Sequence, residues 1–185
     1  MRVISGKRKG HNLKTIKSND IRPTEDRVKE SVFNILGNIE SDSMVLDLFA
    51  GTGAIGIEFL SRGAELAYFI DTSFNSIKVI KENLSHTKLE DRAQVYKQNS
   101  LVAIKVLNER EVKFDYIYID PPFKGHKLFH EVLESLTEYP ILKKEGLIII
   151  EHEKSLKIKE DLTSFKKIDE RKYGNKIVNF LRCRD

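Results

Sequence analysis

Several residue types are scarce in this chain of 185 residues, and each scarcity excludes a class of protein. The chain has no tryptophan and one cysteine, Cys183, which excludes an internal disulfide and is typical of a reducing cytoplasm. No apolar run approaches the roughly 20 residues that span a membrane, and the N-terminus lacks the apolar segment of a signal peptide. The five histidines show no zinc-ligand spacing. We therefore expect a cytoplasmic protein with no membrane contact and no bound metal.

Acidic residues are absent from the first 19 positions, although these positions contain six lysines and arginines. The formal net charge is +4, and the rest of the chain carries 26 basic against 28 acidic residues. A basic arm on a nearly neutral domain predicts a polyanionic partner such as a nucleic acid. The alternative is a solvated surface segment. The candidate phosphate contacts are Lys7, Arg8, Lys9, Arg22 and Arg27.

A carboxylate, two prolines and an aromatic residue follow an apolar run at 114–119 that predicts a buried strand. Each of the prolines, Pro121 and Pro122, fixes φ and lacks an N–H, and the residue before a proline is held extended. The chain therefore leaves the strand rigidly, with unpaired carbonyl oxygens. This suits a planar ring with an exocyclic amine, whose hydrogens meet Asp120 and the Pro121 carbonyl while the ring stacks on Phe123. The alternative is an ordinary strand end with Phe123 in the core.

A glycine motif joins another short apolar run to a predicted helix. Gly51, Gly53 and Gly56 have the spacing G-x-G-x-x-G, which between a strand and a helix is typical of nucleotide binding. Glycine lets the backbone turn tightly and approach a ligand closely. Asp71 lies 20 residues past Gly51, at the end of the next apolar run, where it would accept hydrogen bonds from ribose hydroxyls. The alternative is a tight strand–helix turn without a ligand.

Asp47 indicates which nucleotide the glycine motif binds. The pyrophosphate of NAD gains from positive charge at a helix N-terminus, and a carboxylate at the end of the preceding strand opposes it. S-adenosylmethionine carries a cationic amino group, a sulfonium and a ribose, so it fits both Asp47 and Asp71. An amine-binding motif at a neighbouring strand end then predicts an N-methyltransferase. The predicted cofactor-binding residues are Asp47, Phe49, Gly51, Gly53, Asp71, Asn99 and Ser100.

From residue 44 onward strands and helices alternate, which predicts an α/β fold with a doubly wound, mostly parallel, Rossmann-like sheet. We predict strands at 44–48, 67–70, 93–96, 114–119 and 147–150, the last after a turn at Gly146, and helices at 54–62, 75–84, 101–107 and 127–136. An antiparallel hairpin at 165–172 and 177–182, joined at Gly174-Asn175, completes seven strands. Such sheets bind ligands at the carboxyl ends of their strands, where Asp47, Asp71, Asn99 and Asp120 all fall.

The first 37 residues are expected to form a basic unit in front of a methyltransferase domain that spans 38–185. Residues 2–5 and 12–16 predict a short hairpin with a cationic tip. A helix follows, which begins near Thr24 and ends at Gly37.

Longer stretches of the chain carry a family resemblance. They are Arg2-Val3-Ile4-Ser5-Gly6 with Lys9-Gly10, Arg22-Pro23-Thr24-Glu25-Asp26-Arg27-Val28-Lys29-Glu30 running into Phe33-Asn34-Ile35-Leu36, Leu46-Asp47-Leu48-Phe49-Ala50-Gly51-Thr52-Gly53, Asp120-Pro121-Pro122-Phe123 and Tyr173-Gly174. By these marks the chain resembles the class I methyltransferases and, more closely, the RsmD family, which methylates N2 of a guanine in bacterial 16S ribosomal RNA. The glycine loop is common to many methyltransferases, and adenine and cytosine N-methylases share the proline motif. The Arg-Pro block is therefore the more specific mark.

The resemblance implies an S-adenosylmethionine-dependent enzyme that methylates guanine N2 at position 966 of 16S ribosomal RNA, either free or in a small-subunit particle. We expect the protein to be a monomer. Three departures are mild. Asp71 stands where the family often has Glu, Phe123 replaces the commoner Tyr, and Asn99 stands where many relatives have Asp. The main competing hypothesis is an N-methyltransferase acting on adenine or cytosine in DNA. An NAD(P) oxidoreductase of the same fold and a non-catalytic RNA-binding module fit the sequence less well.

Overall fold

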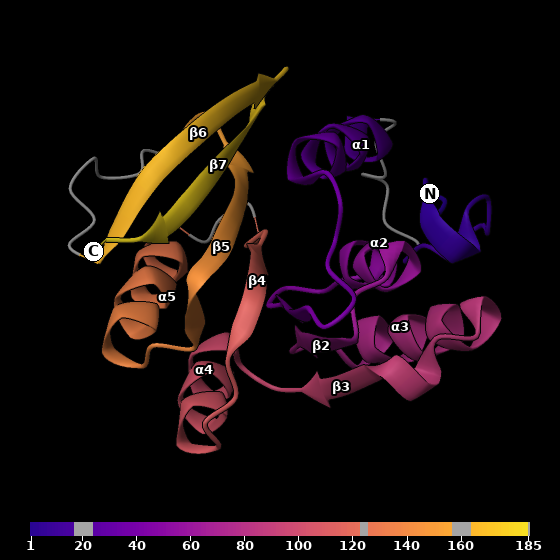
Figure 1. Cartoon of the computed structure of the whole chain (residues 1–185), viewed down its shortest axis with the longest axis horizontal. Helices are drawn as coiled ribbons and strands as arrows, with labels where there is room; N and C mark the ends of the chain where they lie inside the picture. The colour runs from indigo at the N-terminus through magenta and orange to yellow at the C-terminus, as the bar shows by residue number, and fades with distance from the viewer. Residues whose placement is uncertain (17–23, 123–125, 157–163, 185) are drawn as a thin grey trace.

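The structure, a computed structural model, describes residues 1–16, 24–122, 126–156 and 164–184. Seven strands form one sheet in the order β3-β2-β1-β4-β5-β7-β6 (Figure 1). Strands β1 to β5 run parallel, whereas β7 is antiparallel to β5 and β6, so the predicted doubly wound sheet and its closing hairpin are confirmed. The strands are β1 Met44–Asp47, β2 Leu66–Asp71, β3 Ala93–Lys97, β4 Phe114–Ile119, β5 Leu142–Glu153, β6 Phe165–Tyr173 and β7 Lys176–Cys183.

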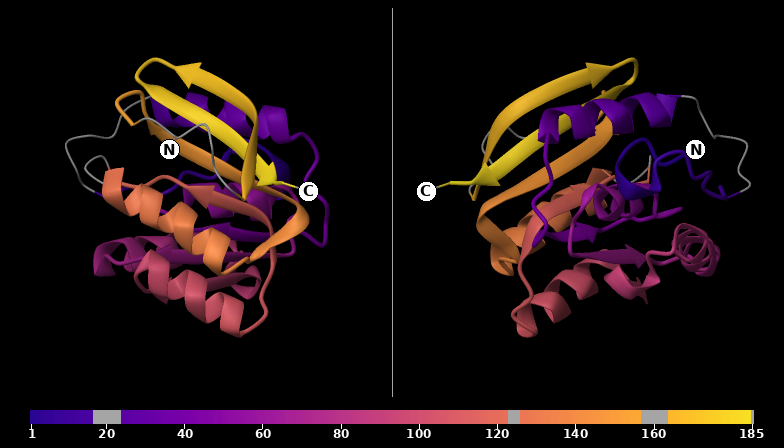
Figure 2. Two further views of the ribbon diagram at one scale, coloured as in Figure 1. Left: turned by 90° about the vertical axis from the view of Figure 1, so that its left-hand side faces the viewer. Right: turned by 45° about the vertical axis from the view of Figure 1, so that its right-hand side comes forward.

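Helices cover both faces of this sheet. They are α1 Thr24–Leu36, α2 Ala54–Arg62, α3 Phe74–Thr87, α4 Ser100–Glu109 and α5 His126–Glu138. Buried side chains of α1, α2 and α3 pack in one cluster with one face of the sheet, and those of α4 and α5 pack in a second cluster with the other face (Figure 1). Helix α1 lies beside the β6–β7 hairpin (Figure 2), where the hydroxyl groups of Ser31 and Tyr173 are 2.5 Å apart.

The strand order reverses at β1, which has β2 on one side and β4 on the other. The carboxyl ends of parallel strands at such a point form the usual ligand site of an open α/β sheet. Asp47 is the last residue of β1, Asp71 is the last residue of β2, and Asp120 directly follows β4. The three carboxylates therefore lie at one edge of the sheet, as the sequence predicts.

The predicted N-terminal hairpin is present in a shorter form, with the Val3 N–H donating to the His11 carbonyl and the Leu13 N–H donating to the Met1 carbonyl. An isolated bridge between Arg2 and Asn12 replaces the two strands, and a 3-10 turn at Gly6–Arg8 stands at the tip. The backbone N–H groups of Ile4 and Ser5 donate to the Glu58 carboxylate of α2, so they are not available for a second strand. Gly6 has a φ of +81°, and a Cβ there would lie 1.9 Å from the Ser61 carbonyl oxygen. The arm is therefore built to pack closely on α2.

Strand β5 is longer than predicted, and Gly146 lies inside it instead of in a turn before it. The pairing with β4 shifts from Phe114 opposite Leu142 to Tyr116 opposite Leu147, which places an irregularity at residues 143–146. At its other end the strand continues through the buried polar residues Glu151 and His152, which hydrogen-bond to Tyr118 and to Asn179 of β7, respectively. Satisfied polar groups let a buried strand extend beyond its apolar run.

The described residues among 1–37 pack against the sheet. Val3, Leu13 and Phe33 belong to the same buried cluster as Val45 of β1 and Phe180 of β7. The boundary after residue 37 stays a prediction about the chain's organisation.

The described residues contain no helix both long and apolar enough to cross a bilayer. They also contain no cluster of three or more His, Cys, Asp or Glu side chains that could hold a metal ion. Cys183 ends β7 half-buried, and burial raises the pKa of its thiol.

Candidate active site

Two pockets open at the carboxyl ends of the central strands and share Phe49 and Asp120 in their walls. We call the first the lysine pocket; its wall contains Lys29, Asp47, Gly51, Thr52, Tyr118, Glu151 and Lys176. We call the second the asparagine pocket; its wall contains Asp71, Thr72, Gln98, Asn99, Ser100 and Pro122. Because Asp120 lines both pockets, it could contact a ligand in either of them.

The glycine loop is held in shape by the acid that follows β2. Gly51 has a φ of +53°, and Gly53, with a φ of +78°, precedes the first residue of α2. The Gly51 N–H donates to Asp71 Oδ2 at 2.9 Å, and Asp71 Oδ1 accepts from the Ser73 N–H at 2.8 Å. Gly56 allows α2 to pack closely on β2, since a Cβ there would lie 2.3 Å from the Phe69 ring. The motif therefore needs its glycines for backbone shape and for packing.

Asp47 lies buried beneath the loop, in the wall of the lysine pocket. Its Oδ2 accepts from the Gly56 N–H at 3.1 Å, at the N-terminal end of α2. Burial raises the pKa of this carboxyl to about 7, and the nearby charge of Asp71 adds to the effect. A cation entering the pocket would stabilise the charged form and lower that pKa. The site is therefore suited to a positively charged ligand.

Asn99 and Ser100 lie at the start of α4, in the wall of the asparagine pocket. Asn99 is the N-cap, and its Oδ1 accepts from the N–H groups of Leu101 at 2.9 Å and Val102 at 3.4 Å. The Asn99 side chain thus fixes the first turn of α4. Ser100 is buried beside it.

The proline motif leaves β4 toward both pockets. Asp120 is exposed and lines both of them, Pro121 is half-buried, and Pro122 lines the asparagine pocket. Phe123 lies outside the described residues, so its predicted stacking role stays a prediction. Three predicted elements of the site, the glycine loop, Asp71 and the proline motif, are nevertheless brought together around the same two pockets.

A second polar group in the lysine pocket was not predicted from the sequence. The Tyr118 hydroxyl donates to Glu151 Oε2 at 2.6 Å, and the Lys176 ammonium donates to Glu151 Oε1. Burial raises the pKa of Tyr118, and the charges of Glu151 and Asp120 raise it further. A signal was present, because Glu151 directly follows the apolar run 147–150, as Asp120 follows the run of β4.

Of the predicted phosphate contacts, Lys7, Lys9 and Arg27 are exposed. Arg8 is half-buried; its side chain donates to the Lys88 carbonyl at 3.3 Å, and its backbone N–H donates to Ser61 Oγ at 3.0 Å. The structure therefore uses Arg8 to fasten the arm. Arg22 lies outside the described residues.

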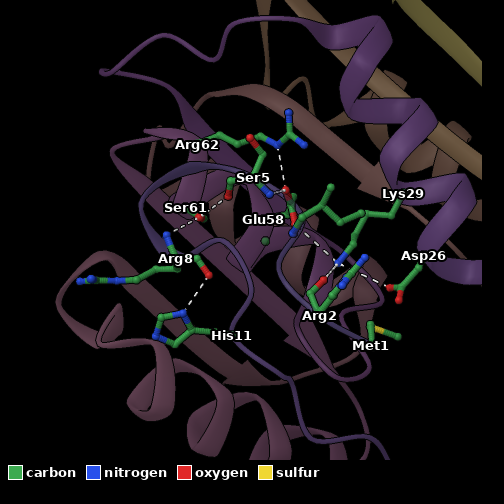
Figure 3. A network of polar contacts seen from close by, with 12 residues as sticks. Met1, Arg2, Ser5, Arg8, His11, Asp26, Lys29, Glu58, Ser61 and Arg62 are labelled. Carbon is green, nitrogen blue, oxygen red and sulfur yellow. Dashed lines mark hydrogen bonds and ion pairs between the residues drawn. The ribbon is translucent and has the colours of Figure 1, made fainter.

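The arm is clamped to the rest of the fold by a buried carboxylate on α2 (Figure 3). Glu58, which is 0% exposed, accepts from the N–H groups of Ile4 at 2.8 Å and Ser5 at 3.0 Å. Arg62 donates to it at 2.9 Å, and Lys29 of α1 lies 3.5 Å from it. Lys29 also donates to the Arg2 carbonyl at 2.6 Å, and burial lowers the pKa of its ammonium against the opposing effect of Glu58. The arm, α1 and α2 therefore meet at one ionic cluster beside the lysine pocket.

This combination of features defines a class of protein. A doubly wound sheet with a glycine loop after β1, an acid after β2, a polar cap on α4 and an Asp-Pro-Pro sequence after β4 is the arrangement of a class I methyltransferase that uses S-adenosylmethionine.

Comparison with known proteins narrows the class. A family described as "Conserved hypothetical protein 95" matches residues 1–182. A Bacillus subtilis protein named "Putative rRNA methyltransferase YlbH" is 40% identical over 94% of each chain, and the "Ribosomal RNA small subunit methyltransferase D" of Haemophilus influenzae is 37% identical over 83% of this chain and 79% of its own. The solved "Putative methyltransferase yhhF from Escherichia coli" superimposes with a TM-score of 0.86 at 27% identity, over 100% of this chain and 98% of its own. The chain belongs to this family, the RsmD family of S-adenosylmethionine-dependent methyltransferases.

Proposed function

We propose that the protein methylates the exocyclic N2 amine of a guanine in 16S ribosomal RNA, at position 966 by the family resemblance. The names of the relatives support ribosomal RNA of the small subunit as the substrate. The observation that carries the choice of an amine is the position of Asp120, at the rigid end of β4 and in the walls of both pockets. A donor-rich amine fits a carboxylate acceptor that lines both pockets.

The residues of the two pockets fit S-adenosylmethionine, which supplies an electrophilic methyl group on a sulfonium when bound. A carboxylate has about four acceptor sites, and Asp71 uses two of them for Gly51 and Ser73, so it can also accept from ribose hydroxyls. Asp47 would stabilise the cationic end of the cofactor. Asn99 and Ser100 would border the adenine, and Phe49 would lie against it from the wall that both pockets share.

The chain's task in catalysis is to position a poor nucleophile. The lone pair of guanine N2 is delocalised into the ring, so the amine must be oriented in line with the methyl group. Asp120 Oδ and the Pro121 carbonyl accept the amine hydrogens and favour tetrahedral geometry at that nitrogen. Asp120 or a water then takes the released proton. The base must leave its stack to reach the site, and Phe123 would replace the lost stacking, a contribution of about 1–3 kcal/mol.

The exposed cations would hold the RNA backbone. Lys7 and Lys9 on the arm and Arg27 on α1 lie on segments that the Glu58 cluster joins. Contacts of this kind fix the position and orientation of a nucleic acid but carry no sequence information. We include Arg22 in the same role by its place in the Arg-Pro block.

The test is methyl transfer from labelled S-adenosylmethionine to 16S ribosomal RNA, both free and in small-subunit particles, followed by mass spectrometry of nuclease fragments. We expect one modified guanine carrying the methyl group on N2. The isosteric variant Asp120→Asn should lose at least about a hundredfold in kcat, since a lost transition-state acceptor costs about that much, while its cofactor affinity changes by no more than a few fold. Methylation of DNA, or of another base or atom, would contradict the proposal.

A further inference from the structure

Polar side chains from four strands face the lysine pocket from one side of the sheet. Asp47 of β1 is paired with Tyr118 of β4, and Ile119 is paired with Ile150 of β5. Asp120 and Glu151 are therefore the next positions along two neighbouring parallel strands. Side chains alternate between the faces of a sheet, so Asp47, Tyr118, Asp120 and Glu151 share a face with Lys176 of β7, and all of them line the lysine pocket.

Glu151 has acceptor capacity left for a ligand. Its side chain is 8% exposed, and its two oxygens accept from Tyr118 and Lys176. Since a carboxylate has about four acceptor sites, these two bonds leave one on each oxygen. The bonds also hold the carboxylate in one orientation in the pocket wall.

Stability alone gives little reason for this group. The strand before Glu151 is apolar through 147–150, and replacing a buried ion pair by apolar residues is often neutral for stability or favourable. An ionised carboxylate with a tyrosine and a lysine at a pocket wall is better explained by a ligand that presents hydrogen-bond donors.

We propose that Glu151 determines the base specificity of the enzyme by accepting a hydrogen bond from N1–H of the target guanine, an inference that rests on the proposed function. In guanine, N1–H is a donor directly beside the N2 amine. In adenine and cytosine, the ring nitrogen beside the exocyclic amine is an acceptor, which a carboxylate repels. When Asp120 accepts a hydrogen bond from the exocyclic amine, the neighbouring carboxylate of Glu151 faces the adjacent ring nitrogen. Of the three bases, only guanine has a donor, N1–H, at that position. Tyr118 and Lys176 act as positioning residues for Glu151.

The first test needs no variant. Wild-type enzyme is given two RNA substrates that differ only at the methylated nucleotide, one with guanine and one with 2-aminopurine. 2-Aminopurine keeps the amine but has an acceptor at N1. We expect kcat/KM to be about 10 to 100 times lower for 2-aminopurine, the range for an unpaired buried acceptor. Equal kcat/KM values for the two RNAs would overturn the inference, whereas no transfer to guanine N2 at all would overturn the proposed function itself.

The second test assigns that preference to Glu151. The Gln side chain of Glu151→Gln has the same shape and can donate to the N1 acceptor of 2-aminopurine. We expect the variant's kcat/KM for guanine to fall and its kcat/KM for 2-aminopurine to hold or rise, so that the preference shrinks at least about tenfold.

Tyr118→Phe is the matched control, because it removes a bond to the same carboxylate and leaves the charge in place. Because the carboxylate acceptor remains, this variant should keep most of the preference for guanine over 2-aminopurine, even where kcat/KM falls. If Glu151→Gln behaves in this way too, Glu151 has only a structural role and the inference is wrong. If Glu151→Gln does not fold, the wild-type comparison can still overturn the inference.

Discussion

Two buried glutamates with lysine partners lie in the described part of the chain, and they differ in how completely the protein satisfies them. Glu58 is 0% exposed and receives two backbone N–H groups and two cations from three separate segments. Glu151 receives one hydroxyl and one ammonium and lines a pocket. A carboxylate saturated by protein donors joins segments, whereas one with capacity left at a pocket wall is available for a ligand.

The largest effect on stability is expected at Glu58. Glu58→Ala leaves Lys29, Arg62 and two backbone N–H groups without their shared acceptor, and breaking a buried pair from one side costs about 3–5 kcal/mol. Urea unfolding should show this loss. The matched control is Glu82→Ala, which removes an exposed ion pair with Lys14 and should cost less than about 1 kcal/mol. Similar costs for the two variants would show that Glu58 is no clamp.

The Glu151 group should behave in the opposite way. We expect the triple variant Tyr118→Phe, Glu151→Leu, Lys176→Met to unfold within about 1 kcal/mol of wild type, because apolar residues replace the tyrosine, the glutamate and the lysine together. The same variant should lose about 10- to 100-fold in kcat/KM for guanine RNA, since its N1–H then has no acceptor. A loss of stability comparable with that of Glu58→Ala would erase the distinction between the two glutamates.

Asp47 is satisfied less completely than either glutamate, because it accepts one backbone N–H bond, and its pKa is raised to about 7. Its carboxyl is protonated in the free protein below that pH, and binding a cation requires loss of the proton. S-adenosylmethionine affinity should therefore rise about tenfold from pH 5.5 to pH 7 and then level off. Calorimetry across this range checks the expectation.

Asp47→Asn is the control for this pH dependence. It should bind the cofactor more weakly and show no pH dependence between pH 5.5 and pH 7. Folding stability gives a second check with the opposite sign. A raised native pKa costs stability as pH rises from about 4 to 7, so the Asn variant should equal wild type near pH 4 and exceed it at pH 7. A pH profile that is the same in both proteins would remove Asp47 from cofactor binding.

Local sequence predicts some of these groups and not others. Asp71 and Asp120 each end an apolar run, and Asp47 interrupts one near its end, so these runs predict both the strands and the positions of the acids. Glu58 and Glu151 depend on partners from other segments, with Ser5 53 residues from Glu58 and Tyr118 33 residues from Glu151. Such contacts require the register of the sheet and the packing of the arm on α2. The N-terminal hairpin is shorter than predicted for the same reason, because the N–H groups of Ile4 and Ser5 bond to Glu58.

The smallest effect concerns the arm that Glu58 clamps. Because Arg8 is fastened to the Lys88 carbonyl, Lys7 and Lys9 are left as the exposed cations beside it. Replacing both by Ala should weaken RNA binding only a few fold near 0.1 M salt. The slope of log K against log salt should flatten by about 0.7–0.9 for each lost phosphate contact. Binding titrations at several salt concentrations measure both quantities.

Two control variants and a cofactor measurement make this test of the arm specific. Lys105→Ala, on the exposed side of α4, removes a charge from the opposite face of the sheet and should leave the salt slope unchanged. Cofactor affinity of the Lys7→Ala, Lys9→Ala variant should equal that of wild type, because the glycine loop and Asp71 do not touch these side chains. Glu58→Ala should flatten the slope as much as the double variant does, since without the clamp the two lysines lose their fixed position. If the double variant keeps the wild-type slope, the clamp supports only the core and the arm has no part in holding RNA.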